Sequence, residues 1–147
     1  MKVVLQRVLN SSVTVNNEVI AQIGQGLLVL LGVEATDTKA QAEKMVDKIA
    51  KSRIFADGHG KTNLSVSDIN GEVLIISQFT LCADTKKGNR PSFINAAPPD
   101  LALELYEYFI DISAGRFKKV EKGQFAADMK VSLVNDGPFT ILMEVIT

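Results

Sequence analysis

Two short segments supply the residue types that could carry chemistry in this chain. The first, SQFTL at residues 77–81, offers two hydroxyls, a side-chain amide and backbone N–H groups at the end of an apolar run. Groups of this kind can stabilise an oxyanion, but the segment contains no general base. Ser77 and Thr80 could instead end a strand and satisfy backbone groups there, and composition alone favours that interpretation.

The second segment is NDGPFT, residues 135–140, which lies between two apolar runs. Gly137 can adopt backbone angles that other residues avoid, and Pro138 can form a cis peptide bond at modest cost. A cis Gly-Pro bond would fix the direction of the neighbouring carbonyls, which could then hold an ammonium group. The residue types alone, however, favour an ordinary hairpin corner.

The rest of the chain excludes several common kinds of active site. Its one histidine, His59, lies between two glycines and is expected to be a solvated loop residue. With Cys82 as the only cysteine, a zinc site of the usual ligand set is not expected, and a Ser-His-Asp triad would have to use His59. The common phosphate-binding glycine motifs are absent. We therefore expect neither a metal nor another cofactor.

The composition indicates a soluble, cytoplasmic protein of one domain, residues 1–147. The chain is 46% hydrophobic, which is enough to build a core, and it carries 16 basic and 17 acidic residues. Because the charge is balanced, an RNA partner would have to be held by a local patch. The single cysteine fits a reducing compartment. No signal peptide is expected, and the apolar runs are too short to span a bilayer.

The strands that must position the two segments are predicted from periodicity. Residues 13–24 alternate around Asn16-Asn17 and predict a hairpin. Residues 26–33 and 72–81 are apolar runs that predict buried strands. The second run would point alternate side chains to opposite faces, with Ser77, Phe79 and Leu81 on one face and Gln78 and Thr80 on the other. Further strands are expected at residues 117–124, 129–134 and 139–146.

Two helices are predicted between these strands. Thr36 or Asp37 is expected to cap the first, whose apolar residues recur at helical spacing: Ala42, Met45, Val46 and Ile49. The second begins at Pro98-Pro99 and ends at Gly115, with an apolar face of Leu101, Leu105, Tyr108, Phe109 and Ile112. Residues 56–63 are expected to form a loop. The pattern predicts a mixed α/β domain with six or seven strands in a largely antiparallel sheet and two helices packed on it.

Together, the motifs resemble those of the D-aminoacyl-tRNA deacylase family. The resemblance runs from end to end and includes the opening MKVVLQRV, SQFTL, the loop NRPSF at residues 89–93, and NDGPFT. SQFTL and a Gly-Pro-x-Thr segment at this spacing form a specific pair, although either alone would be a weak signal. The resemblance implies the barrel-like fold of that family.

The resemblance also implies a reaction and an assembly. Members of this family cleave the ester that joins a D-amino acid, or glycine, to the 3′-terminal adenosine of tRNA. They work as homodimers in which Gly137-Pro138, with a cis bond, would reach into the partner subunit's site. Its carbonyls would hold the substrate's amino group and Cα hydrogen. An L side chain would then collide with the backbone, which gives chiral selection without a side-chain pocket.

The resemblance further suggests how the reaction proceeds without a protein base. The ribose 2′-hydroxyl of the terminal adenosine would assist the attack, while backbone N–H groups of Phe79 and Thr80 stabilise the oxyanion. Ser77 and Gln78 would orient the ester. Thr80 is a second candidate for nucleophile, but without a base to activate it we favour a positioning role.

The tRNA contacts rest on weaker signals. Arg7 and the cluster Lys86, Lys87 and Arg90 could meet acceptor-stem phosphates or could simply be solvated. Phe79 or Phe93 could stack on adenine, although Phe93 could equally belong to the core. The near-zero net charge predicts contact with the acceptor end only.

Three other functions fit parts of this pattern. One is a related deacylase that clears a different misacylated tRNA, such as one with L-alanine, and in which the Gly-Pro bond is trans. Another is an RNA-end binding module without catalysis. The third is a proofreading module of a threonyl-tRNA synthetase, whose archaeal editing domain resembles this fold. We disfavour this last function because 147 residues leave no room for a synthetase domain.

Overall fold

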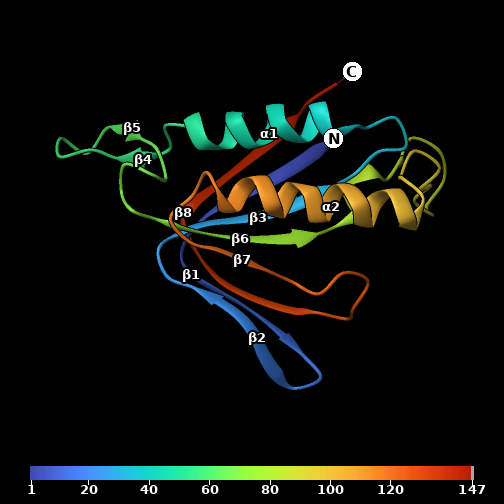
Figure 1. Cartoon of the computed structure of the whole chain (residues 1–147), viewed down its shortest axis with the longest axis horizontal. Helices are drawn as coiled ribbons and strands as arrows, with labels where there is room; N and C mark the ends of the chain where they lie inside the picture. Colours follow the sequence, from blue (N-terminus) through green and yellow to red (C-terminus); the bar gives the residue numbers. More distant parts are fainter. Residues whose placement is uncertain (147) are drawn as a thin grey trace.

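The main sheet combines long antiparallel strands with parallel ones. The computed structural model describes residues 1–146 (Figure 1). The strands follow the order β2-β1-β3-β6-β7, and β8 pairs with the opposite edge of β1. Strand β1 is antiparallel to β2, β3 and β8, whereas β6 is parallel to β3 and β7. The strands span Lys2–Val15 (β1), Glu18–Ile23 (β2), Gly26–Gly32 (β3), Glu72–Ser77 (β6), Val120–Lys122 (β7) and Lys130–Glu144 (β8).

Strand β3 is buried on both faces, as predicted, because it lies between two hydrophobic clusters. Leu27, Val29 and Leu31 belong to the cluster that includes helices α1 and α2. Leu28 belongs to the second cluster, which residues of β1, β2 and β6 complete. Figure 1 shows the two helices together over one face of the sheet, while β1 and β2 curl below it. The predicted mixed α/β, barrel-like domain with two packed helices is therefore confirmed.

Helix α1, Lys39–Lys51, is capped by Thr38 and by neither of the two residues expected from the sequence. The Thr38 hydroxyl accepts from the backbone N–H of Ala40, and the Gln41 side chain accepts from the N–H of Thr38 at 2.8 Å. Asp37 is buried instead against the amino group of Met1, with 2.6 Å between oxygen and nitrogen. The cap predicted at Thr36 or Asp37 is therefore wrong, and for Asp37 the reason is that this ion pair occupies its carboxylate.

Helix α2, Pro99–Ala114, ends at Gly115 as predicted, but the prediction of its buried face is partly wrong. Leu105 and Phe109 are buried as expected, whereas the buried tyrosine is Tyr106, because its hydroxyl reaches the Ile75 carbonyl at 3.0 Å. Tyr108 is half-buried and donates to the Glu43 carboxylate of α1 at 2.6 Å. The helix thus presents a face rotated from the one that apolar periodicity suggested.

The two predicted turns have different outcomes. The hairpin is confirmed, since Asn16 and Asn17 join β1 to β2 with φ values of 49° and 65°, as a type I′ turn requires. The loop expected at residues 56–63 is confirmed for residues 57–61, whereas its two ends belong to a small sheet of β4, Phe55–Ala56, and β5, Thr62–Leu64. His59 is exposed there, as expected.

No helix in residues 1–146 has the length and apolar character needed to cross a membrane.

Candidate active site

The SQFTL segment leaves the sheet where β6 ends and turns into a short 3₁₀ helix. Strand β6 stops at Ser77, and the helix η1 covers Phe79–Cys82. Gln78 makes the last bond to the sheet, from its N–H to the Leu31 carbonyl at 2.7 Å. The predicted strand to Leu81, with alternating faces, is therefore wrong, because the neighbouring β3 ends at Gly32 and offers no further partner.

Gly32 allows this turn to pack closely against the end of β3. A Cβ atom at Gly32 would lie 2.9 Å from the Cβ of Leu81 and 3.2 Å from the Gln78 carbonyl oxygen. A larger residue would push η1 away from the sheet. The ends of two parallel strands thus set the position of the SQFTL backbone.

The polar residues of the turn differ in exposure, since Ser77 and Gln78 are half-buried. Thr80 is exposed, and its hydroxyl accepts a hydrogen bond from the Gln78 amide at 2.5 Å. This bond orients the hydroxyl but supplies no base. Phe79 and Thr80 open the helical turn, and the first N–H groups of a helical segment have no acceptor within it. These two N–H groups are therefore available to an incoming oxygen atom.

An exposed aromatic pair lies beside this turn. The rings of Phe79 and Phe93 meet edge to face with centroids 5.1 Å apart, and the two residues are 54% and 38% exposed. Phe93 is therefore a surface residue. The loop between the rings is closed by two backbone hydrogen bonds between Asp84 and Ser92. It carries the predicted tRNA-binding residues Lys86, Lys87 and Arg90, all of them exposed.

The NDGPFT segment is a bulge within β8. Gln6 pairs with Thr140 and Val8 pairs with Asn135, so residues 136–139 stand opposite Arg7 alone. The hairpin corner favoured by the residue types is wrong, because β8 remains antiparallel to β1 on both sides of the segment. The Gly137-Pro138 bond is cis, Gly137 has a φ of 139°, and both residues are exposed. The bulge thus presents a Gly-Pro tip to solvent.

Arg7 secures the base of this bulge. Its Nε donates to the Asp136 carbonyl at 3.0 Å, and its Nη1 donates to the Ile54 carbonyl at 2.7 Å. Its guanidinium also lies 4.4 Å from the ring centroid of Phe139. The side chain is 15% exposed and engaged within the chain. Its contact with tRNA phosphates stays a prediction. The structure also gives Arg7 a positional role at the bulge, which the sequence did not suggest.

Gln6 was not identified from the sequence, yet it contacts both ends of the bulge. Its side-chain oxygen accepts from the Asn135 amide at 2.7 Å and from the Thr140 hydroxyl at 2.5 Å. The only signal in the sequence is a polar residue within the apolar opening run, and its meaning depends on the pairing of β1 with β8.

The two segments are far apart within one chain. Gln78 is bonded to Leu31, whereas Arg7, beside the Gly-Pro tip, pairs with Leu27. Four residues of strand separate these positions, or about 13 Å at 3.3 Å per residue. Strands β1 and β3 also lie between β8 and β6. The structure therefore does not bring SQFTL and Gly137-Pro138 together within one subunit.

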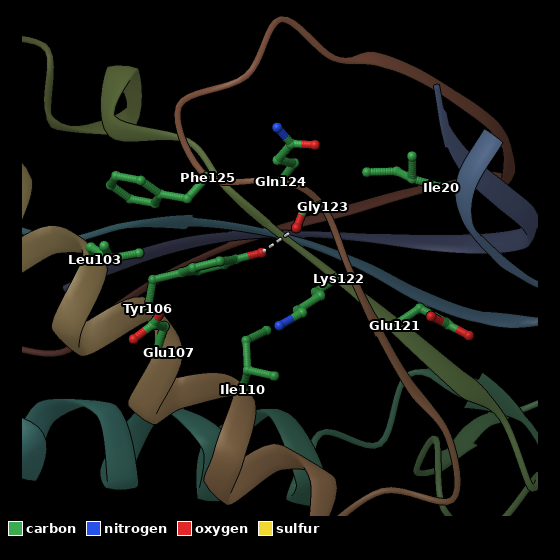
Figure 2. A pocket seen from close by; sticks show the side chains of 10 residues that line it. All are labelled: Ile20, Leu103, Tyr106, Glu107, Ile110, Glu121, Lys122, Gly123, Gln124 and Phe125. Carbon is green, nitrogen blue, oxygen red and sulfur yellow. Dashed lines mark hydrogen bonds between the residues drawn. The ribbon is translucent and has the colours of Figure 1, made fainter. Parts of the chain in front are cut away.

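A pocket of about 410 Å³ opens elsewhere, between α2, β7 and β2 (Figure 2). The Tyr106 hydroxyl at its floor lies 3.4 Å from the Gly123 carbonyl oxygen and 3.0 Å from that of Ile75. Burial raises the pKa of Tyr106 to about 12, so its hydroxyl stays neutral and structural near neutral pH. The pocket is lined by no residue of SQFTL or NDGPFT. Within residues 1–146, no group of three or more His, Cys, Asp or Glu side chains could hold a metal ion.

Comparison with solved structures identifies the class of fold. A structure described as "Structural Analysis of a probable eukaryotic D-amino acid tRNA deacylase" has a TM-score of 0.85, covers 98% of both chains and is 18% identical, so it shows the fold alone. A structure described as "c-Myc DNA Unwinding Element Binding Protein" has a TM-score of 0.95 with 42% identity and covers both chains completely.

Comparison of sequences identifies the family. The family model described as D-Tyr-tRNA(Tyr) deacylase matches residues 4–144. The D-aminoacyl-tRNA deacylase of Haemophilus influenzae (strain PittEE) is 56% identical over 99% of this chain and 100% of its own. The D-aminoacyl-tRNA deacylase of Cellvibrio japonicus (strain Ueda107) is 51% identical over 95% of this chain and 96% of its own. This chain belongs to the D-aminoacyl-tRNA deacylase family, and the recognition of a deacylase from its motifs is confirmed.

Proposed function

We propose that this chain, as one domain over residues 1–147, hydrolyses the ester of D-aminoacyl-tRNA and of glycyl-tRNA formed on a non-cognate tRNA. The products are the free amino acid and intact tRNA. The single observation that carries this proposal is that a member of this family exposes both the SQFTL turn and the Gly137-Pro138 tip. The single, buried Cys82 fits the reducing cytoplasm as the site of action.

The active unit of this proposal is a homodimer. A second copy would bring its Gly137-Pro138 tip to the SQFTL turn, which the same chain cannot do across about 13 Å of strand. The exposed apolar residues of β8 support this assembly, since Leu133, Val134 and Leu142 are 37%, 46% and 79% exposed. Among the described strands, β8 pairs only with β1, so its other edge is free for a partner.

Catalysis in this proposal relies on backbone groups and on the substrate. Water adds to the ester carbonyl with help from the ribose 2′-hydroxyl, and the N–H groups of Phe79 and Thr80 stabilise the oxyanion. The bond to the 3′-oxygen then breaks, and that oxygen takes up a proton. Ser77 and Gln78 orient the ester, and Thr80 is a positioning residue, because its recorded partner is the Gln78 amide, which is no base.

Chiral selection follows from the tip of the partner subunit. The carbonyls at Gly137 and Pro138 would hold the substrate's amino group and Cα hydrogen, so an L side chain would point into the backbone. No side-chain pocket is needed, which would let one enzyme accept many D-amino acids.

The acceptor end of tRNA would lie on the exposed loop and aromatic pair. Lys86, Lys87 and Arg90 supply positive charge for phosphates, and Phe79 with Phe93 offers a surface on which the terminal adenine can stack. Contact limited to this end agrees with a net charge of −1.

A direct test compares the hydrolysis of D-Tyr-tRNA and L-Tyr-tRNA at equal enzyme concentration. We expect rapid loss of the D-ester and stability of the L-ester. Loss of neither ester, with tRNA still bound, would instead establish a nucleic-acid binding module. The exposed aromatic pair beside basic residues favours that module as the second candidate. A fully active monomer at high dilution would contradict the shared site.

A further inference from the structure

Gln6 lies at the narrow neck of the Gly137-Pro138 bulge. The bulge leaves β8 after Asn135 and rejoins it at Thr140, and the Gln6 side chain bonds to both of these residues. One acceptor oxygen, Oε1, therefore joins the two ends of a four-residue insertion. We propose that Gln6 is a positioning residue for the Gly-Pro tip, which deepens the proposed deacylase function and rests on it.

A backbone N–H fixes the direction of each hydrogen bond at this neck. The N–H of Phe139 can only donate, and it donates to the Asn135 side-chain oxygen at 3.0 Å. The Asn135 amide nitrogen must then face Gln6, so Gln6 must present its oxygen at 2.7 Å. The Thr140 hydroxyl, which can rotate, donates to the same oxygen. The network thus requires an acceptor at position 6.

This chain of bonds reaches the residue that follows Pro138. Gln6 orients Asn135, and Asn135 holds the N–H of Phe139, so the amide of Gln6 sets where the Gly-Pro tip ends. Arg7, the next residue of β1, holds the start of the same tip through the Asp136 carbonyl. If Gln6 lost its oxygen, Asn135 could rotate, and the Phe139 N–H at the end of the tip would lose its oriented acceptor.

The first measurement compares two substitutions with a matched control. Gln6→Met keeps the length of the side chain without an acceptor, whereas Gln6→Glu keeps the acceptor. Ser11→Ala is the control, because Ser11 also links β1 to β8, through a bond to the Ser132 carbonyl at 2.8 Å that lies away from the bulge. For D-Tyr-tRNA we expect Gln6→Met to lower kcat/KM about tenfold and to narrow the D over L preference by a similar factor. Gln6→Glu should restore most of kcat/KM and most of the D over L preference. Ser11→Ala should leave the D over L preference unchanged.

Hydrogen exchange at the Phe139 amide tests the inference without any activity. We expect faster exchange in Gln6→Met than in Gln6→Glu or Ser11→Ala. Unchanged exchange in Gln6→Met would overturn the role of Gln6. A wild-type D over L preference in Gln6→Met would also overturn the role of Gln6.

The two proposals fail in different ways. Absence of D-ester hydrolysis by the unmodified protein would remove the deacylase function that this inference deepens, and the role of Gln6 in substrate selection would fall with it. Hydrolysis by the unmodified protein together with a fully selective Gln6→Met variant would remove only the role of Gln6.

Discussion

The SQFTL turn and the Gly137-Pro138 bulge are both exposed, but different kinds of contact hold them. The turn is fixed by backbone bonds at the end of β6, such as that from Gln78 to Leu31, and by the close approach of Gly32. The bulge is held largely by the side chains of Gln6 and Arg7 on a neighbouring strand. Backbone support tolerates most substitutions within a segment, whereas side-chain support can be lost by one substitution outside it.

This difference matches the tasks we propose for the two regions. Oxyanion stabilisation needs N–H groups in a fixed direction, and the start of a helical turn provides them without any particular side chain. Chiral selection needs a rigid obstacle, which a bulge provides only when both of its ends are held. Changes around the bulge should therefore affect selectivity, whereas side-chain changes in the turn should affect the rate modestly.

The largest effect is expected from the substrate itself. A D-aminoacyl-tRNA that ends in 2′-deoxyadenosine lacks the hydroxyl that would assist the attack. We expect its hydrolysis to be at least about 100-fold slower, the lower end of the usual contribution of a general base. Single-turnover rates with saturating enzyme measure this effect, with a 3′-terminal riboadenosine substrate as control. Equal rates for the two substrates would contradict the proposed assistance by the 2′-hydroxyl.

Gly137→Ala is expected to have the largest effect among the substitutions in the bulge. An added Cβ would lie 2.9 Å from the Phe139 nitrogen and 3.3 Å from Arg7 Nη2, at a φ of 139° that L residues rarely adopt. The tip must shift, and a displacement of about 1 Å can cost about 100-fold in rate. The assay is D-Tyr-tRNA hydrolysis by the folded variant.

Gly60→Ala provides the matched control for this substitution. Gly60 also has a positive φ, 75°, but nothing lies within 4 Å of its added Cβ. This variant should carry the strain of a left-handed non-glycine residue, about 1–2 kcal/mol, and keep full activity. Equal losses in the two variants would show that strain, and not the position of the tip, determines the activity.

The outcome of sequence-based prediction also differs between the two regions. Local periodicity was enough for β3 and for the Asn16-Asn17 hairpin, because each depends on neighbours in the chain. The bulge depends on pairing between residues 6–8 and 135–140, far apart in sequence, so its residue types suggested only a corner. Strand β6 likewise ends where its neighbour β3 ends. The alternation of residue types in SQFTL cannot indicate this end, because it depends on another strand.

The same limit applies to individual residues of the site. The charge of Arg7 is compatible with tRNA phosphates or with solvent, whereas its contact with the Asp136 carbonyl follows from the register of β1 and β8. Gln6 was missed for the same reason. Motif similarity located SQFTL and Gly137-Pro138, but the side chains that support the bulge could be found only in three dimensions.

Arg7→Lys separates the two roles of that residue. Lysine keeps the charge but cannot reach the Asp136 and Ile54 carbonyls together, because it lacks the forked guanidinium. We expect about tenfold lower kcat/KM with a narrower D over L preference, from the loss of one or two hydrogen bonds to a charged group. The measurement is kcat/KM for both esters at several salt concentrations. Retained selectivity with an altered salt dependence would assign Arg7 to tRNA phosphates instead.

The smallest effect is expected from Thr80→Ala in the SQFTL turn. The Thr80 hydroxyl accepts from the Gln78 amide, and the N–H of residue 80 remains after the substitution. The rate should therefore fall only a few-fold, since one neutral hydrogen bond contributes about 0.5–1.5 kcal/mol. Pre-steady-state hydrolysis of D-Tyr-tRNA gives the chemical step directly. A fall to the uncatalysed rate would make Thr80 the nucleophile, and the turn would then depend on a side chain as strongly as the bulge does.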